Sequence, residues 1–81
     1  MERLEKIIAI IRKIGELTIK EDMVITGDTD IISDLRFDSL DMVMIADEIE
    51  ETFGVTIEND MIQEIRTVND VNEKLSILLG E

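Results

Sequence analysis

Residues 36–54 read RFDSLDMVMIADEIEETFG and carry the clearest information on the fold of this chain. Seven of the ten residues from Phe37 to Ala46 are apolar, which is more than one buried face of a soluble helix needs. The spacing predicts a helix over residues 39–53, ended by Gly54. Its core stripe follows the series i, i+3, i+4, i+7 and i+11 and consists of Met42, Ile45, Ala46, Ile49 and Phe53.

The surplus apolar residues form a second face of this helix, opposite the core stripe. Leu40, Val43 and Met44 gather there, and Asp47 and Glu51 continue the same face. A small bundle covers only one side of such a helix, so we expect the three apolar side chains to be exposed. An exposed apolar patch bordered by acids is typical of a surface that binds another protein. The alternative is that the preceding loop folds over the patch.

Helical periodicity also marks the two ends of the chain. The segment before Gly15 places one apolar residue after another on a single face: Leu4, Ile7, Ile8, Ile11 and Ile14. Near the other end, Thr67 and Asp70 resemble a capping box with aspartate in place of glutamate. They predict the start of a last helix that Gly80 ends.

The remaining segments complete an all-α fold. Residues 55–57 are expected to be extended, and Asn59 is expected to cap a short third helix. Residues 16–37 show no period and predict a long first loop. A calcium loop starting at Asp28 is disfavoured, because the glycine and the glutamate that such a loop needs are missing. The sequence therefore predicts one domain over residues 1–81, a small four-helix bundle with three main helices and one short helix.

Composition and charge limit the functions open to this chain. It has no histidine and no cysteine, which excludes histidine-based catalysis, disulfides and Cys/His zinc sites. Twenty acids against eight bases give a net charge of −12, which repels nucleic acid and anionic membranes. From Phe37 to Ile65 there are nine acids and no base, so the expected partner is a basic protein surface. No secretion signal or membrane span is apparent, and we expect a cytoplasmic monomer.

Ser39, at the head of the second helix, has three interpretations. It is either the helix cap, a role that Asp38 could take instead, or a nucleophile, or a residue that another enzyme modifies. The nucleophile is disfavoured because no activating base is available. A modified serine at a helix start would hold an attached phosphate beside free backbone N–H groups and beside the apolar patch.

Several segments together resemble the acyl carrier proteins. DLRFDSLDMV at 34–43 follows the family pattern D-L-G-[AF]-D-S-L-D-x-V, whose serine carries 4′-phosphopantetheine. EIEETFGVTI at 48–57 is similar to the acidic close of the family's second helix. EIRTVNDV at 64–71 is similar to the entry into its last helix. The resemblance covers nearly the whole chain, in the right order.

The resemblance implies a carrier without catalytic activity of its own. Ser39 would carry 4′-phosphopantetheine, transferred from coenzyme A by a holo-acyl-carrier-protein synthase, a phosphopantetheinyl transferase, and Asp38 would hold the serine region. Acyl groups would travel as thioesters between the acyl-transferring and condensing enzymes of fatty acid or polyketide synthesis. A recognition face would meet basic patches on those enzymes; it consists of Leu40, Asp41, Val43, Met44, Asp47 and Glu48. An acyl chain would shelter in the interior, with candidate lining from Ile45, Ile49, Phe53, Ile57, Ile62 and Val68, which are simply core residues in the alternative interpretation.

The chain departs from the family pattern at two places. Arg36 replaces the usual glycine, which puts the local turn in doubt and brings a cation close to the attachment site. Met44 stands where fatty-acid members often carry glutamate, and Asp47 where an apolar residue is common. These departures leave open whether the chain serves housekeeping fatty acid synthesis or a specialised pathway with its own enzymes. Independently of them, the alternatives are a peptidyl or aminoacyl carrier and a helical interaction module without a prosthetic group.

Overall fold

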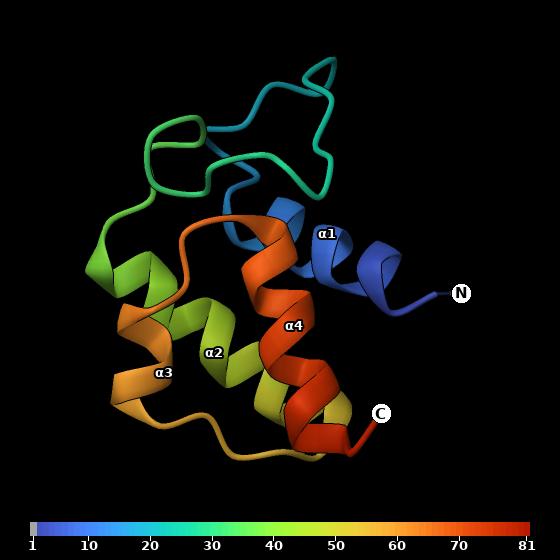
Figure 1. Cartoon of the computed structure of the whole chain (residues 1–81). Helices are drawn as coiled ribbons and strands as arrows, with labels where there is room; N and C mark the ends of the chain where they lie inside the picture. Colours follow the sequence, from blue (N-terminus) through green and yellow to red (C-terminus); the bar gives the residue numbers. More distant parts are fainter. Residues whose placement is uncertain (1) are drawn as a thin grey trace.

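The computed structural model describes residues 2–81, and these residues form four helices (Figure 1). They are α1 (Arg3–Ile14), α2 (Ser39–Phe53), α3 (Asn59–Gln63) and α4 (Val68–Leu79). The prediction of an all-α bundle with three main helices, one short helix and a long first loop is confirmed. The part of the chain described here contains no helix both long and apolar enough to cross a membrane.

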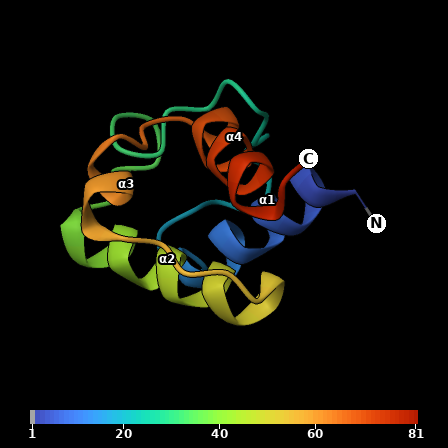
Figure 2. The same cartoon turned by 60° about the horizontal axis from the view of Figure 1, so that its bottom comes forward.

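Helix α1 packs against both α2 and α4, while the short α3 packs against α2 (Figure 2). The buried stripe of α1 consists of Ile7, Ile10 and Ile11, at the spacing i, i+3 and i+4, while Ile8 is only half-buried. Helix α2 contributes four of its five predicted core residues as buried side chains, and Phe53 packs half-buried against them. The most deeply buried side chains come from all three main helices and from the loop: Ile7, Ile11, Ile31, Ile45, Ile49, Val68, Val71 and Leu75.

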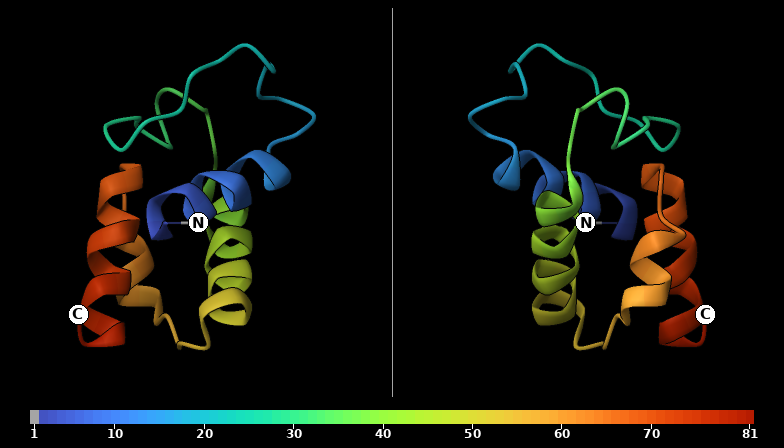
Figure 3. Two further views of the ribbon diagram at one scale, coloured as in Figure 1. Left: turned by 90° about the vertical axis from the view of Figure 1, so that its right-hand side faces the viewer. Right: turned by 90° about the vertical axis from the view of Figure 1, so that its left-hand side faces the viewer.

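The long loop lies across the end of the bundle at which α2 and α4 begin (Figure 3). It is anchored by apolar side chains that enter the core, namely Ile25, Ile31, Leu35 and Phe37. This burial accounts for an ordered loop of such length, because loops without apolar anchors lack contacts to offset the entropy of ordering. The loop does not cover the second apolar face of α2, so that alternative is wrong.

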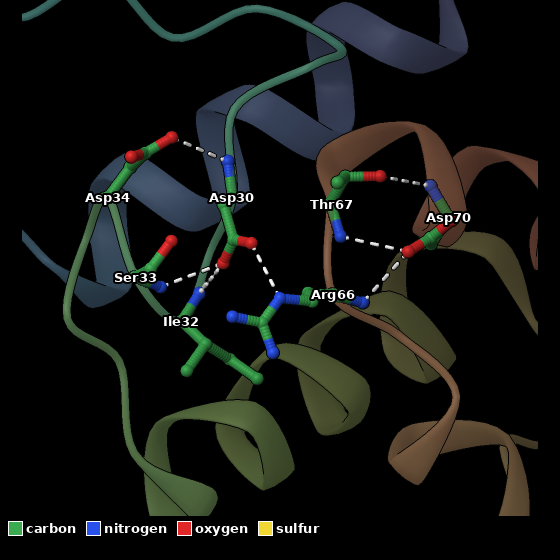
Figure 4. Close-up of polar contacts among 7 residues, drawn as sticks. All are labelled: Asp30, Ile32, Ser33, Asp34, Arg66, Thr67 and Asp70. Carbon is green, nitrogen blue, oxygen red and sulfur yellow. Dashed lines mark hydrogen bonds and ion pairs between the residues drawn. The ribbon is translucent and has the colours of Figure 1, made fainter.

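Backbone hydrogen bonds tie the loop to the turn before α4. Asp30 and Thr67 form an isolated antiparallel bridge, and the Ile31 N–H donates to the Arg66 carbonyl at 2.8 Å. The Asp30 carboxylate accepts the backbone N–H groups of Ile32 and Ser33 at 2.9 and 2.7 Å (Figure 4). The oxygens of Asp30 therefore organise the loop. Residues 2–81 contain no cluster of three or more acidic side chains that could hold a metal ion.

The helices begin and end where the sequence predicts, with one exception. Thr67 and Asp70 form the predicted capping box at α4, with the Asp70 N–H donating to the Thr67 hydroxyl at 3.2 Å. At α3 the prediction is wrong, because Glu58 occupies the cap position and Asn59 is already the first helical residue. The buried Ile57 anchors the chain just before it, and its N–H donates to the Glu50 carboxylate at 2.7 Å. This anchor starts the helix one residue earlier than the cap preference of asparagine indicates.

Candidate functional site

Ser39 is the first residue of α2, directly after a completed cap. The Asp38 carboxylate accepts the Asp41 N–H at 2.9 Å, and the Asp41 carboxylate accepts the Asp38 N–H at 3.1 Å. Asp38 is thus the helix cap, and Ser39 is not. The reciprocal bonds fix the first turn of α2 and, with it, the position of the serine.

The Ser39 side chain is available for reaction. Ser39 is exposed, and its hydroxyl has no hydrogen-bond partner among residues 2–81. Since the chain contains neither histidine nor cysteine, the serine has no imidazole or thiolate to activate it. The arrangement therefore favours a serine that a second protein modifies over a serine that performs catalysis itself.

The carboxylate beside the serine is kept ionised. The Asp41 N–H, which donates to Asp38, lowers the pKa of the Asp38 carboxyl below its ordinary value of 3.8. The start of a helix also favours a negative charge. Any group attached to Ser39 consequently lies next to a fixed anion.

A groove opens beside Ser39, between α2 and α3. Its volume is about 290 Å³, and it is lined by Ser39, Met42, Val43, Asn59, Ile62 and Gln63. Of the lining residues suggested by the sequence, the structure brings only Ile62 to this groove. The others are buried in the core or, in the case of Phe53, packed against it. The sequence carried a signal for the missed residues on α2, since Met42 and Val43 stand at i+3 and i+4 from the serine and must share its side of the helix.

The second apolar face of α2 is open to solvent. Leu40, Val43 and Met44 are 66, 42 and 39% exposed. Asp47 is exposed on the same face, and no ion pair within residues 2–81 includes it. These four residues, with Asp41 and Glu48 on the flank, make up the predicted recognition face.

The two flanking acids already have partners within the fold. Asp41 belongs to the cap of α2, and the Glu48 carboxylate lies 3.5 Å from the Lys13 ammonium of α1. The structure thus separates the six residues into an exposed stripe and two flanking acids that already have partners. Periodicity alone predicted the exposed stripe, whereas the contact with Lys13 depends on how α1 packs.

Arg36 carries the one positive φ found at a non-glycine residue in the described chain. Its φ is 60°, in the left-handed region that side chains other than glycine rarely adopt. The turn before α2 therefore keeps the conformation that a glycine would allow, although an arginine occupies the position. The sequence correctly marked this position as conformationally unusual.

Residues 5–74 of this chain match the protein family described as "Phosphopantetheine attachment site". The match defines a protein to which a phosphopantetheine group is covalently attached. The exposed, unbonded serine hydroxyl beside an apolar groove fits such a group. The family is one of carriers rather than enzymes.

Individual relatives specify the class further. An acyl carrier protein of Coprothermobacter proteolyticus is 40% identical over 72 residues, which cover 88% of this chain and 87% of the relative. A chloroplastic acyl carrier protein of Casuarina glauca is 36% identical over 78 residues, but this chain spans only 55% of its length. The solved structure of a protein assigned as an acyl carrier protein, from Mycobacterium tuberculosis, has a TM-score of 0.80 at 32% identity, covering 91% of this chain and 95% of that one. The chain belongs to the acyl carrier protein family.

Proposed function

We propose that Ser39 is the residue to which 4′-phosphopantetheine is attached. The observation that carries this proposal is its exposed hydroxyl, free of hydrogen bonds within residues 2–81 and fixed at the start of α2. The other serines are engaged elsewhere: the Ser76 hydroxyl donates to the Glu81 carbonyl at 2.7 Å, and Ser33 belongs to the turn around Asp30. Ser39 is also the serine that lines the groove between α2 and α3.

The attachment is a transfer from coenzyme A. The Ser39 oxygen forms a bond to the phosphorus that bears the pantetheine portion, and the bond from this phosphorus to the neighbouring phosphate breaks. Adenosine 3′,5′-bisphosphate leaves, and the hydroxyl proton is lost to a base of the transferase. This chain contributes the acceptor oxygen, and Asp38 holds it in place through the cap of α2. Because no group of this chain is hydrogen-bonded to the Ser39 hydroxyl within residues 2–81 to take its proton, a phosphopantetheinyl transferase is a necessary partner.

As a carrier, the chain presents an acyl group and does not transform it. When bound, the arm supplies a terminal thiol that holds the acyl group as a thioester. The groove beside Ser39 offers an apolar lining from Met42, Val43 and Ile62, against which the arm or the start of an acyl chain can pack. This view replaces the interior lining expected from the sequence, most of which belongs to the closed core.

The partner enzymes bind the recognition face of α2. Its exposed apolar residues fit shallow apolar pockets, and its acids fit basic patches around them. On these grounds we assign the protein to fatty acid or polyketide synthesis, as a cytoplasmic, monomeric, single carrier domain over residues 1–81. Its net charge of −12 argues against nucleic acid or an anionic membrane as a partner.

An intact-mass experiment tests the attachment. The purified protein is incubated with coenzyme A and a broad-specificity phosphopantetheinyl transferase, alongside the Ser39→Ala and Ser33→Ala variants. The wild type and Ser33→Ala are expected to gain the mass of one phosphopantetheine, and Ser39→Ala none. A gain on Ser39→Ala would place the arm on another residue.

Two further results distinguish the alternatives. If loading enzymes for amino acids accept the holo form and those for acyl groups do not, the protein is a peptidyl or aminoacyl carrier. If the wild type gains no mass with any transferase, while Ser39→Ala keeps all partner binding, the protein is an interaction module without an arm.

A further inference from the structure

The strained backbone at Arg36 results from the packing of its two neighbours and not from its own side chain. Its neighbours Leu35 and Phe37 are 5 and 4% exposed, so the chain enters the core on both sides of it. These two anchors force a tight turn, and Arg36 adopts a φ of 60° to complete it. A glycine would meet this geometry without the steric penalty on a Cβ atom. Packing thus explains the turn, but not why the position holds an exposed arginine.

The guanidinium of Arg36 has no carboxylate partner within the fold. None of the ion pairs formed by residues 2–81 includes Arg36. The acids nearest in sequence are occupied: Asp34 accepts the Asp30 N–H at 2.9 Å, and Asp38 caps α2. Arg36 therefore retains a full positive charge without a fixed counter-ion.

Arg36 is also isolated from other cations in the sequence. No lysine or arginine occurs between it and Arg66, and the Nε atom of Arg66 donates to Asp30 at 2.6 Å. The same interval contains nine acids. Arg36 consequently stands at the border of an acidic segment, three positions before Ser39.

Distance and chemistry allow Arg36 to meet a phosphate on Ser39. Three residues of extended chain span at most roughly 10–11 Å, and a long arginine side chain turned towards Ser39 reduces the separation between the charges. At 0.1 M salt the Debye length is about 10 Å, so two charges at this separation still interact. The planar guanidinium fits phosphate oxygens and stays charged at every relevant pH.

We propose that Arg36 is the counter-ion of the phosphodiester formed at Ser39. Arg36 acts as a positioning residue: it holds the base of the arm towards the long loop and offsets the repulsion from Asp38. The inference rests on the proposed modification of Ser39. It adds a role that the bond formation itself does not require, because the phosphorus is joined to the serine oxygen alone.

The test compares apo and holo protein in variants matched at the backbone. Arg36→Asn removes the charge with a residue that tolerates positive φ, and Arg36→Lys keeps the charge without the planar fork. Lys6→Gln is the control, since it removes one positive charge from the exposed surface of α1, whereas Lys20 lines the same pocket as Arg36. Intact mass first establishes that each variant carries the arm, and circular dichroism that each is folded.

Two readouts report on the contact itself. In about 10 mM salt, where the Debye length is roughly 30 Å, the phosphorus resonance of the arm and the Arg36 Nε–H resonance are recorded by NMR. The phosphorus resonance is expected to differ between wild type and Arg36→Asn, and the Arg36 Nε–H resonance between the apo and holo forms of the wild type. Lys6→Gln is expected to leave both resonances as they are in the wild type. The change in melting temperature on attachment of the arm is expected to be roughly 2–5 °C less favourable in Arg36→Asn than in wild type.

Each outcome bears on a defined part of the proposal. If the arm attaches but the phosphorus resonance and the holo-minus-apo melting difference are the same in wild type and Arg36→Asn, the counter-ion role is wrong and the carrier function stands. If Lys6→Gln reproduces the effect of Arg36→Asn, the effect reflects overall charge and the inference fails as well. If no arm attaches to Ser39, the inference fails together with the proposed function.

Discussion

The Nε atom of Arg66 donates to the Oδ2 atom of Asp30 at 2.6 Å, and this contact joins the middle of the long loop to the turn before α4 (Figure 4). The two residues contribute unequally to holding the long loop in place. Arg66 is mostly exposed and makes one side-chain contact, whereas Asp30 also accepts two backbone N–H groups of its own loop. The loop therefore depends on the aspartate more than on the ion pair.

We expect Asp30→Ala to lower the melting temperature clearly more than Arg66→Ala. Removing the carboxylate leaves the N–H groups of Ile32 and Ser33 without acceptors, while removing the guanidinium breaks only a solvent-exposed ion pair. Thermal unfolding of the two variants and of the double variant measures the difference. Equal losses would show that the ion pair, and not the Asp30 turn, holds the loop.

Replacing Arg36 by glycine is expected to stabilise the fold. Release of the steric cost at a φ of 60° outweighs the greater chain entropy of glycine, for a net gain of about 0.5–1 kcal/mol in the free energy of unfolding. Arg36→Ala is the control, because it removes the same charge but retains the Cβ atom. Chemical denaturation of both variants measures the change. If alanine stabilises as much as glycine, charge and not backbone strain is the cause.

Sequence patterns predicted most of this structure because its elements are set locally. The two faces of α2, the capping box at Thr67 and the final glycines depend on residues close together in the chain. What the patterns missed depends on packing between elements. The groove beside Ser39 requires α3 to sit against α2, and the ion pair between Lys13 and Glu48 requires α1 to lie against α2. The sequence left open whether Ser39 caps the helix, and the structure shows that its hydroxyl is free because Asp38 is the cap.

Stability is expected to fall in acid through three aspartates. Hydrogen bonds from backbone N–H groups lower the pKa of Asp30, Asp38 and Asp70, with the leading donors at Ser33, Asp41 and Thr67. A pKa lowered by folding stabilises the native state above the unfolded value, near 3.8, and this stabilisation is lost as the pH falls through the folded value. Urea unfolding between pH 5 and about pH 2 measures the loss. Asp70→Asn is expected to weaken the dependence of stability on pH. If this dependence is the same as in the wild type, Asp70 does not contribute to the loss of stability in acid.

Salt is expected to raise the melting temperature at neutral pH. The net charge of −12, concentrated along and after α2, opposes the compact state by self-repulsion, which added ions screen. The same ions weaken the exposed pairs such as Lys13–Glu48, but these contribute little. Melting curves from about 10 mM to about 500 mM sodium chloride test the balance. A melting temperature that does not rise would mean that self-repulsion does not limit the stability of this fold.

The exposed apolar stripe of α2 is expected to determine how well partner enzymes use the holo protein. Leu40→Ala or Met44→Ala should lower kcat/KM of an acyl-loading enzyme by roughly 5- to 10-fold, since truncating a central apolar contact typically costs more than 1 kcal/mol of binding. Ile77→Ala is the matched control, because Ile77 is 71% exposed but lies on α4, away from Ser39. All three variants should retain the arm and the fold. An equal loss in Ile77→Ala would place the partner surface elsewhere, whereas a loss confined to Leu40 and Met44 assigns the surplus apolar residues of α2 to partner binding.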